Sequence, residues 1–276
     1  MLLEEKWQKQ IYPLAISSFL RQHNLVQVQW VFLSNNCTPA RWHQFKQRIA
    51  LMQEQIMKFE SLLVLVGGGS LSIKLLKKLY ASGADIIAAD GGARACKKAG
   101  IIPKAIIGDM DSLKNKKQWQ EKSQLIELKE QETTDFEKCL YSTDSPLTIA
   151  LGMTGDWLDH TLNAFDIMAK YACERHIILI DKKDMAFATC GEFSLNIGAG
   201  KRVSIHPLGK VKFEKSISLK FPLTGITLAP KIKSGISNKT ISDSFSIKPE
   251  QGNETPYLVI INKKHLNKAI AKLMQP

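Results

Sequence analysis

Short apolar runs alternate with helical patterns between residues 62 and 180 of this 276-residue chain. The first run, Leu62–Val66, is continuously apolar, as expected for a strand that is covered on both faces. A helical stripe of apolar side chains follows, and then a second run at Asp85–Ala89. Because strands that alternate with helices form parallel sheets, the sequence predicts a parallel, Rossmann-like sheet flanked by helices. The other strands predicted in this part are Ala105–Ile107, Leu125–Leu128, Leu147–Leu151 and Ile177–Ile180.

The pattern changes after about Asp184. Short segments separated by Gly, Pro, Asn and Ser follow, which is typical of antiparallel strands. The sequence therefore predicts an α/β domain over residues 59–188 and a smaller antiparallel β-sandwich domain over residues 189–276. The strands predicted in the second domain are Glu192–Ile197, Arg202–His206, Ser216–Lys220, Ile226–Leu228 and Tyr257–Ile261.

Residues 1–58 form a polar and aromatic segment without a recognisable motif. Two stretches, Leu14–Arg21 and Arg41–Lys58, have a helical pattern. Met52 and Met57 precede the first strong strand, and each is a candidate start of translation. We interpret this segment as an N-terminal extension of unknown role.

Four acidic side chains lie close together in the middle of the sequence. Asp109 and Asp111 follow a predicted strand and Gly108, at the strand end where open α/β sheets bind ligands. Alternate residues of an extended segment point the same way, so this pair can share one metal ion. Glu132 and Asp135 follow further along the chain. Carboxylates at this density repel one another unless a cation lies among them, and oxygen ligands suit Mg²⁺ that carries the phosphates of a nucleotide.

Each of these acidic pairs also has a purely structural interpretation. Asp111 and Ser112 are residue types that favour turns and helix caps. Thr133 or Thr134 can cap a helix whose first turn holds acidic residues, where the helix dipole favours them. Two such clusters together favour a functional site.

Three glycine-containing turns follow predicted strands. Gly67-Gly68-Gly69-Ser70 can hold a phosphate with its backbone amides or be a plain tight turn, and it lacks the Lys-Ser/Thr ending of a Walker A loop. Asp90-Gly91-Gly92 permits close approach of a ligand, with turn geometry as the alternative. The third turn leads into Asp159 and His160, where a carboxylate beside an imidazole can orient a proton acceptor or simply cap a helix.

In this order the motifs resemble those of the thiamine pyrophosphokinase (thiamine diphosphokinase) family. The shared sequence of motifs is Asp-Gly-Gly, Gly-Asp-x-Asp-Ser, an acidic residue before x-Thr-Asp-x-Glu-Lys, and Gly-x-x-Gly-x-x-x-Asp-His. Ser218–Leu223 is similar to the family's Gly-Leu-Lys-Tyr-Pro-Leu segment, and Ser237-Asn238 to its Ser-Asn thiamine-binding pair. The resemblance extends from about Leu62 to the C-terminus.

The resemblance implies an enzyme that transfers the pyrophosphoryl group of ATP to the hydroxyl of thiamine with Mg²⁺, giving thiamine diphosphate and AMP. It also implies a homodimer whose thiamine site lies at the subunit interface. The residues implied for catalysis are Asp90, Asp109, Asp111, Glu132 and Asp135, with Asp109, Asp111 and Asp135 as metal ligands. Those implied for the substrate are Ser237, Asn238, Asp159 and His160, and those for the nucleotide are Gly67, Gly68, Gly91, Gly92, Thr134 and Gly155.

Two positions depart from the family pattern. Trp157 stands where the family usually has an arginine that helps to hold phosphates. Arg94 or a lysine is the candidate replacement for that cation. Glu132 stands where Asp is usual, which keeps the charge on an arm longer by one methylene group.

The net charge of +12 raises nucleic-acid binding as an alternative. Residues 191–276 hold much of the excess, with 14 Lys and Arg against 5 Asp and Glu. Those lysines are not interleaved with aromatic side chains, so we interpret them as a solvated face and expect no nucleic-acid partner. The alternatives kept open are a metal-dependent Asp-x-Asp glycosyltransferase that uses a nucleotide sugar, and a non-catalytic protein that binds thiamine or nucleic acid.

The sequence also favours a cytoplasmic location. No apolar run approaches the roughly 20 residues that cross a bilayer, and the N-terminus has no signal-peptide pattern, so we expect no membrane partner. The five cysteines are widely spaced and odd in number, and we predict reduced thiols that mostly fill the core. They are Cys37, Cys96, Cys139, Cys173 and Cys190.

Overall fold

The computed structural model describes residues 57–274 of the chain. Residues 58–140 and 145–274 belong to one structural unit. The predicted N-terminal extension lies outside the described residues except for its last two, which form β1 (Met57–Lys58). The described β6 (Thr143–Asp144) belongs to the other unit.

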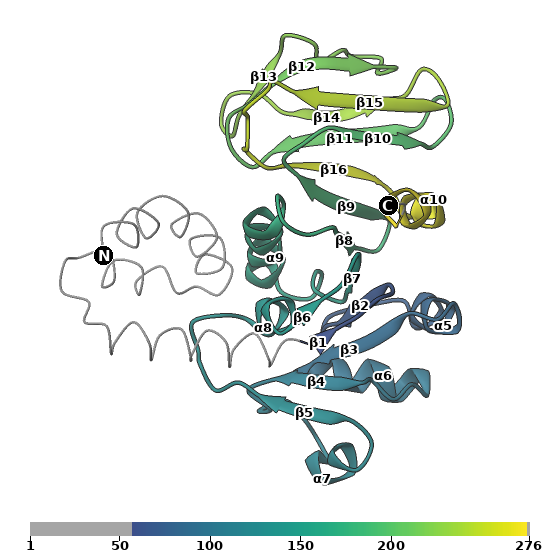
Figure 1. The fold of residues 1–276 in the computed structure, drawn as a ribbon, viewed down its shortest axis with the longest axis vertical. Coiled ribbons are helices and arrows are strands. Elements are labelled where there is room, and N and C mark those ends of the chain that lie inside the picture. The colour runs from purple at the N-terminus through teal and green to yellow at the C-terminus, as the bar shows by residue number, and fades with distance from the viewer. Residues whose placement is uncertain (1–56, 275–276) are drawn as a thin grey trace, which may run out of the picture. The chain divides into compact units, whose positions relative to one another are not determined.

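A large sheet runs through the unit formed by residues 58–140 and 145–274 (Figure 1). Its parallel strands are β2 (Leu63–Val66), β3 (Asp85–Ala89), β4 (Ala105–Gly108), β5 (Gln124–Glu127), β7 (Thr148–Leu151) and β8 (Ile177–Ile180). Its antiparallel strands are β9 (Asp184–Thr189), β11 (Arg202–Pro207), β14 (Gly235–Lys239) and β16 (Tyr257–Asn262). The order across the sheet is β14-β11-β16-β9-β8-β7-β2-β3-β4-β5.

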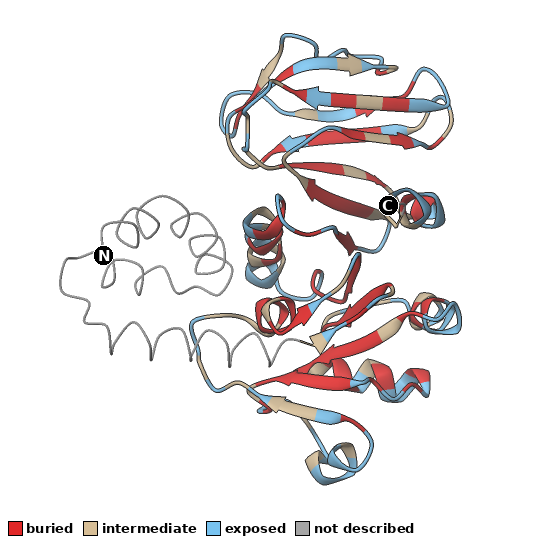
Figure 2. Ribbon diagram, viewed as in Figure 1, coloured by how far each residue is buried: buried red, intermediate tan, exposed pale blue. Residues whose placement is uncertain are grey.

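The central parallel strands are apolar because helices cover both of their faces. Every residue of β2, β4, β7 and β8 is buried, which Figure 2 shows as red strands between partly blue helices. In Figure 1, α5 (Ile73–Ala81) and α6 (Ala93–Ala99) lie on one side of these strands and α9 (Leu158–Tyr171) on the other. The edge strand β5 has no buried residue. The remaining helical segments are η1 (Asp90–Gly92), α7 (Lys116–Gln120), α8 (Asp135–Tyr141), η2 (Lys263–His265) and α10 (Leu266–Leu273).

Across residues 57–274, no helix combines the length and the apolar character that a membrane crossing requires.

A separate antiparallel sheet packs on the antiparallel end of the large sheet. It has the order β10-β15-β12-β13, formed by β10 (Phe193–Asn196), β12 (Val211–Ile217), β13 (Thr227–Leu228) and β15 (Ser244–Pro249). Aromatic rings join the two sheets: Phe213 of β12 meets Tyr257 of β16 edge to face, with 5.3 Å between the ring centroids. Residues 57–274 therefore form a mixed α/β structure with a large sheet and a separate antiparallel sheet, which agrees with the predicted class in this coarse sense. The sequence analysis did not predict that β11, β14 and β16 would continue the large sheet. The domain bounds 59–188 and 189–276 stay a prediction.

Local sequence was less informative in the antiparallel part. The strand predicted at Ser216–Lys220 is wrong in its bounds, since β12 ends at Ile217 and Ser218 has a φ of +61°. The positive φ turns the chain out of the extended conformation that a strand needs. β14 and β15 were not predicted because Gly, Ser, Asn and Asp punctuate them and read as turns. By contrast, α6 ends at Ala99 with a typical signal, a glycine cap at Gly100 with a φ of +71°.

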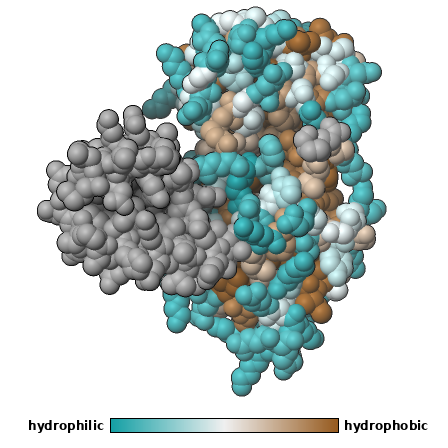
Figure 3. All heavy atoms as spheres, viewed as in Figure 1, coloured by the Kyte–Doolittle hydropathy of each residue, from teal (hydrophilic) through white to brown (hydrophobic). Residues whose placement is uncertain are grey.

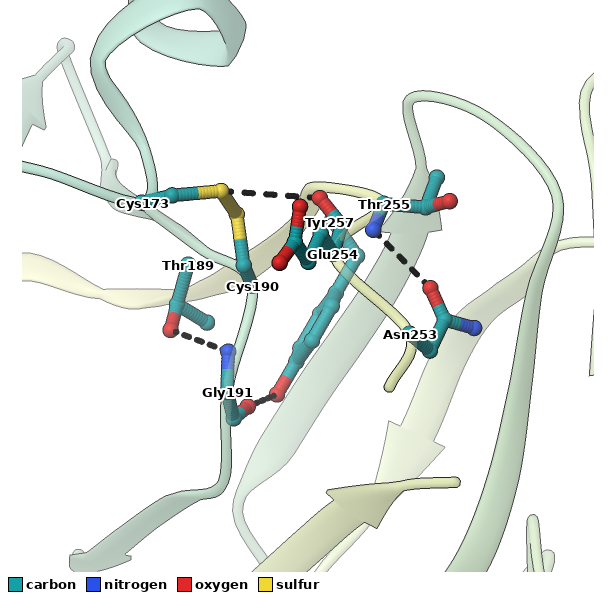
Figure 4. Close-up of a disulfide and its surroundings, with 8 residues drawn as sticks. All are labelled: Cys173, Thr189, Cys190, Gly191, Asn253, Glu254, Thr255 and Tyr257. Atoms are coloured by element: carbon teal, nitrogen blue, oxygen red, sulfur yellow. Dashed lines mark hydrogen bonds between the residues drawn. A yellow bond between two sulfur atoms is a disulfide. The ribbon is translucent and has the colours of Figure 1, made fainter. Parts of the chain in front are cut away.

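Cys173 and Cys190 form a disulfide (Figure 4), so the prediction of reduced thiols is wrong for this pair. Cys173 follows α9 and Cys190 follows β9, and only the packing of these elements brings their Cα atoms to 5.3 Å. Cys96 and Cys139 are buried and form no disulfide, as predicted, and burial raises the pKa of Cys96 to about 12. Cys37 lies outside the described residues.

Removing the disulfide should lower the free energy of unfolding of the oxidised protein by about 3 kcal/mol, because the bond closes a loop in the unfolded chain. Its two cysteines are separated by 17 positions. The test compares the double variant Cys173→Ser with Cys190→Ser against oxidised wild type in urea, with unfolding followed by circular dichroism. Wild type treated with a reductant is the control and should match the variant. Equal stability of oxidised wild type and variant would contradict the prediction.

Candidate active site

A cavity of about 620 Å³ opens where β2, β3, β4 and β7 reach their carboxyl ends. Strand β2 has β3 as its neighbour on one edge and β7, which comes later in the chain, as its neighbour on the other. The strand order therefore reverses at β2. Open α/β sheets bind ligands at such a reversal of strand order, and the cavity has the size of a small-molecule site. Its lining is supplied by some of the residues in five segments, which are 67–69, 89–94, 109–112, 131–138 and 152–164.

Three carboxylates converge beside this cavity. Asp90, Asp109 and Asp135 each offer an oxygen that lies within 4.8 Å of the others. Asp90 follows β3 and Asp109 follows β4, which are neighbouring strands, while Asp135 begins α8. Gly108 permits the approach, because a Cβ there would lie 2.8 Å from the Cβ of Asp90 and 3.0 Å from Oδ1 of Asp135. A larger residue at this position would push the carboxylates apart.

Asp90 is the most buried member, with 1% of its surface exposed. Its Oδ2 accepts a hydrogen bond of 3.0 Å from the backbone N–H of Ser112, whereas Oδ1 has no hydrogen-bond partner within the described chain. Burial raises the pKa of Asp90 to about 6, and the negative charge of Asp135 adds to this against the hydrogen bond from Ser112. Since buried polar atoms normally have partners, Oδ1 is a strong candidate for a cation ligand.

The other carboxylates are held differently. Gln131 donates from Nε2 to Oδ2 of Asp109 at 3.1 Å, and this hydrogen bond lowers the pKa of Asp109. Burial raises the pKa of Asp135, while the positive charge of Lys138 acts in the opposite direction. Asp111 is exposed and lines the cavity outside the group of three. The group thus combines one ionised carboxylate near solvent with two whose charge is disfavoured unless a cation is near.

Lys138 is a site residue that the sequence analysis did not single out. It lines the cavity, only 2% of its surface is exposed, and its Nζ lies 3.5 Å from Oδ1 of Asp135. A lysine is rarely buried without a partner, so this one is held in place by the acidic group. The i,i+3 spacing of Asp135 and Lys138 on a predicted helix was the available signal. Gln131 had no comparable signal.

Part of the predicted nucleotide set lines the cavity, namely Gly67, Gly68, Gly91 and Thr134. Gly92 has a packing role: a Cβ there would lie 1.7 Å from the carbonyl oxygen of Val66. The absence of a side chain at Gly92 allows the η1 turn to pack directly against the backbone at the end of β2. Gly155 lies outside the lining, and its N–H donates to Oγ1 of Thr161 at 3.1 Å.

The positively charged side chain of Arg94 lies where the glycine turns line the cavity. Its Nε donates to the carbonyl of Gly91 at 3.3 Å. Its Nη2 would lie 3.9 Å from a Cβ placed on Gly68, so the guanidinium lies beside both glycine turns. A planar guanidinium in that position suits phosphate oxygens.

The remaining predicted residues divide between the cavity and its surroundings. Glu132 and His160 line it, whereas Asp159 does not. Oδ1 of Asp159 accepts a 2.8 Å hydrogen bond from the backbone N–H of His160, which is a structural role at the start of α9. Asn163, which the sequence analysis did not single out, lines the cavity and accepts a 3.1 Å hydrogen bond from Oγ1 of Thr134.

Ser237 and Asn238 lie on β14, and neither lines the cavity. Asn238 is 2% exposed; its Oδ1 accepts from the N–H of Phe221 at 3.0 Å, and its Nδ2 donates to the carbonyl of Phe221 at 2.7 Å. Ser237 has a φ of +57°. The side chain of Asn238 thus joins the two C-terminal segments, residues 218–223 and 237–238, that carried the sequence resemblance.

Replacing Asp90 by Asn should raise the free energy of unfolding of the metal-free protein by about 1 kcal/mol, because it removes a buried charge repelled by Asp135. Urea denaturation in the presence of EDTA measures this. The matched control, Asp166→Asn on the exposed side of α9, should change it by less than about 0.5 kcal/mol. A destabilised Asp90→Asn variant would show that the carboxylate supports the metal-free fold.

Known proteins share both the motifs and the fold that carry this site. Residues 76–180 match the family model described as thiamin pyrophosphokinase, catalytic domain. The fold is similar to solved thiamine pyrophosphokinases from Bacillus subtilis (20% identity, TM-score 0.61, 73% of this chain and 99% of that one) and Candida albicans (16%, 0.63, 75% and 92%). The yeast enzyme is similar as well (17%, 0.62, 79% and 89%). A search of curated protein sequences found no match. Residues 76–180 of this chain therefore match the thiamin pyrophosphokinase catalytic-domain model, and they lie in a fold similar to that of the solved thiamine pyrophosphokinases.

Proposed function

We propose that this chain is a thiamine diphosphokinase, which transfers the pyrophosphoryl group of ATP to the hydroxyl of thiamine and releases AMP. The observation that carries the proposal is the convergence of Asp90, Asp109 and Asp135 beside a cavity lined by two glycine turns. All three carboxylates belong to the segment that matches the catalytic-domain model. A nucleotide with its metal ion requires this combination of acidic groups and accessible backbone amides.

The donor set fits Mg²⁺. Three carboxylates supply only oxygen atoms, and Oδ1 of Asp90 is buried without a partner within the described chain. We propose Asp90, Asp109 and Asp135 as ligands, with Asp111 contributing from the cavity wall. When bound, Mg²⁺ would neutralise phosphate charge in the transition state.

Pyrophosphoryl transfer needs placement and charge neutralisation more than a protein nucleophile. We propose that Arg94 and Lys138 hold phosphate oxygens while backbone amides of Gly67 and Gly68 approach the phosphate chain. The thiamine oxygen attacks the β-phosphorus, the bond from that phosphorus to the α,β-bridging oxygen breaks, and AMP leaves with that oxygen. We propose that Asp90 or Asp135 accepts the hydroxyl proton, since both carboxylates lie in the acidic group beside the cavity.

Thiamine is proposed to bind at the interface of a homodimer. Ser237 and Asn238 lie outside the cavity, which supports a thiamine site to which a second subunit contributes these residues. Figure 3 shows hydrophobic areas, in brown, among hydrophilic surface on one face. Exposed apolar side chains become an interaction surface where they form a contiguous patch. Those near the predicted thiamine residues in sequence are Phe221, Ile232, Ile236 and Ile241.

The proposal divides the work between residues 59–188, which bind ATP and Mg²⁺, and residues 189–276, which bind thiamine. It also includes the cytoplasmic location that the sequence favours.

The direct test incubates purified protein with ATP, Mg²⁺ and thiamine and separates the products by chromatography. AMP and thiamine diphosphate should form in equal amounts, and neither should form with EDTA or without thiamine. ADP in place of AMP, or no thiamine product, would overturn the proposal. The same assay separates the alternatives, because a glycosyltransferase needs a nucleotide sugar and a non-catalytic binder forms no AMP.

A further inference from the structure

We propose that the indole of Trp157 stacks on the base of the bound nucleotide and thereby sets the affinity for ATP. This inference rests on the proposed function and adds a specificity residue to it. Trp157 immediately precedes α9, lines the cavity, and has 71% of its surface exposed. Such an exposed indole is a large flat apolar surface with few protein neighbours, and aromatic bases are its natural ligands.

The loop that carries Trp157 is tied to the glycine turn after β2. The N–H of Gly69 donates to the carbonyl of Gly152 at 2.9 Å. Oγ of Ser70 donates to Oδ1 of Asp156 at 2.7 Å, one residue before the tryptophan. These contacts hold Trp157 next to the turn that we propose for the phosphates. A nucleotide whose phosphates lie on the turn would therefore occupy the same cavity that the indole lines.

The composition of the cavity wall favours the nucleotide base over the thiamine rings as the partner of Trp157. The aromatic residues in the described lining are Phe136, Trp157 and His160. Phe136 is 5% exposed, so its ring belongs to the core. The residues proposed for thiamine, Ser237 and Asn238, lie outside the lining. The indole is thus the broadest stacking surface in the part of the site that the nucleotide would occupy.

The test measures steady-state kinetics of Trp157→Ala and Trp157→Phe. Because loss of base stacking costs about 1–3 kcal/mol, Trp157→Ala should raise the KM for ATP about 5- to 150-fold, while the KM for thiamine and the kcat change less than about 2-fold. Trp157→Phe keeps a stacking ring and should stay within about 3-fold of wild type. Leu162→Ala, at an exposed apolar position of α9 outside the cavity lining, is the matched control and should behave as wild type.

Inhibition by inorganic tripolyphosphate separates stacking from a structural effect. This anion has phosphates but no base, so its inhibition constant should be the same in wild type and Trp157→Ala. A parallel binding titration uses the ATP analogue with a methylene bridge between the α- and β-phosphates; the analogue should quench wild-type tryptophan fluorescence more than that of Trp157→Phe.

An unchanged KM for ATP in Trp157→Ala, or an increase confined to thiamine, would overturn the inference. Wild type that binds the analogue but forms no AMP would refute the proposed function and leave the stacking result standing.

Discussion

Asp109→Asn should lower the kcat for AMP formation about 10³-fold at saturating ATP and thiamine. The carboxylate of Asp109 is the member of the acidic group whose pKa is lowered, so it carries its charge before a cation arrives. An amide of the same shape keeps the hydrogen-bonding capacity towards Gln131 and loses the negative charge that a divalent cation requires. Chromatographic measurement of AMP over a series of Mg²⁺ concentrations gives both the kcat and the apparent affinity for the metal.

The fold of Asp109→Asn should be intact, because Asp109 is only partly buried. Asp166→Asn makes the same chemical change on the exposed side of α9 and should keep the wild-type rate. Near-normal AMP formation by Asp109→Asn, in protein with a wild-type unfolding curve, would rule out the metal role of this carboxylate.

Gly92→Ala should destabilise the protein by on the order of 4–5 kcal/mol, enough to prevent recovery of folded protein from a marginally stable chain. The new methyl group would lie 1.7 Å from the carbonyl oxygen of Val66 and 2.6 Å from its carbonyl carbon. Both are backbone atoms at the end of β2, so no side-chain rotation relieves the clash. Soluble yield and urea denaturation would show the effect.

Two matched substitutions show whether the effect belongs to this position. Gly191→Ala meets no atom within 4 Å, and Gly68→Ala meets its nearest atoms at 3.6 Å, so both should fold with wild-type stability. A stable Gly92→Ala variant with reduced ATP affinity would instead support the nucleotide-binding role that the resemblance implied for Gly92.

The fold was predictable where one physical pattern dominated. Strands such as Leu63–Val66 and Ile177–Ile180 are buried on both faces, so their composition identifies them without neighbours. β14 and β15 lie in the antiparallel part. β15 alternates between buried and more exposed residues, β14 has a single buried residue, and turn-forming residues in both hide the strand pattern.

Local pattern therefore determined the strand order along the chain, the turns that end the strands, and the acidic motif at Asp109 and Asp111. Tertiary structure decided which groups meet: it joined Asp90 and Asp135 to Asp109, buried Lys138 beside them, paired Cys173 with Cys190, and assigned Gly92 to packing. The spacing of apolar residues along one helix or strand reflects which of its faces is buried, and that spacing can be recognised from the residues close by in the sequence. Contacts between carboxylates, thiols or a glycine and a distant carbonyl depend on how separate elements pack, and no local spacing encodes that.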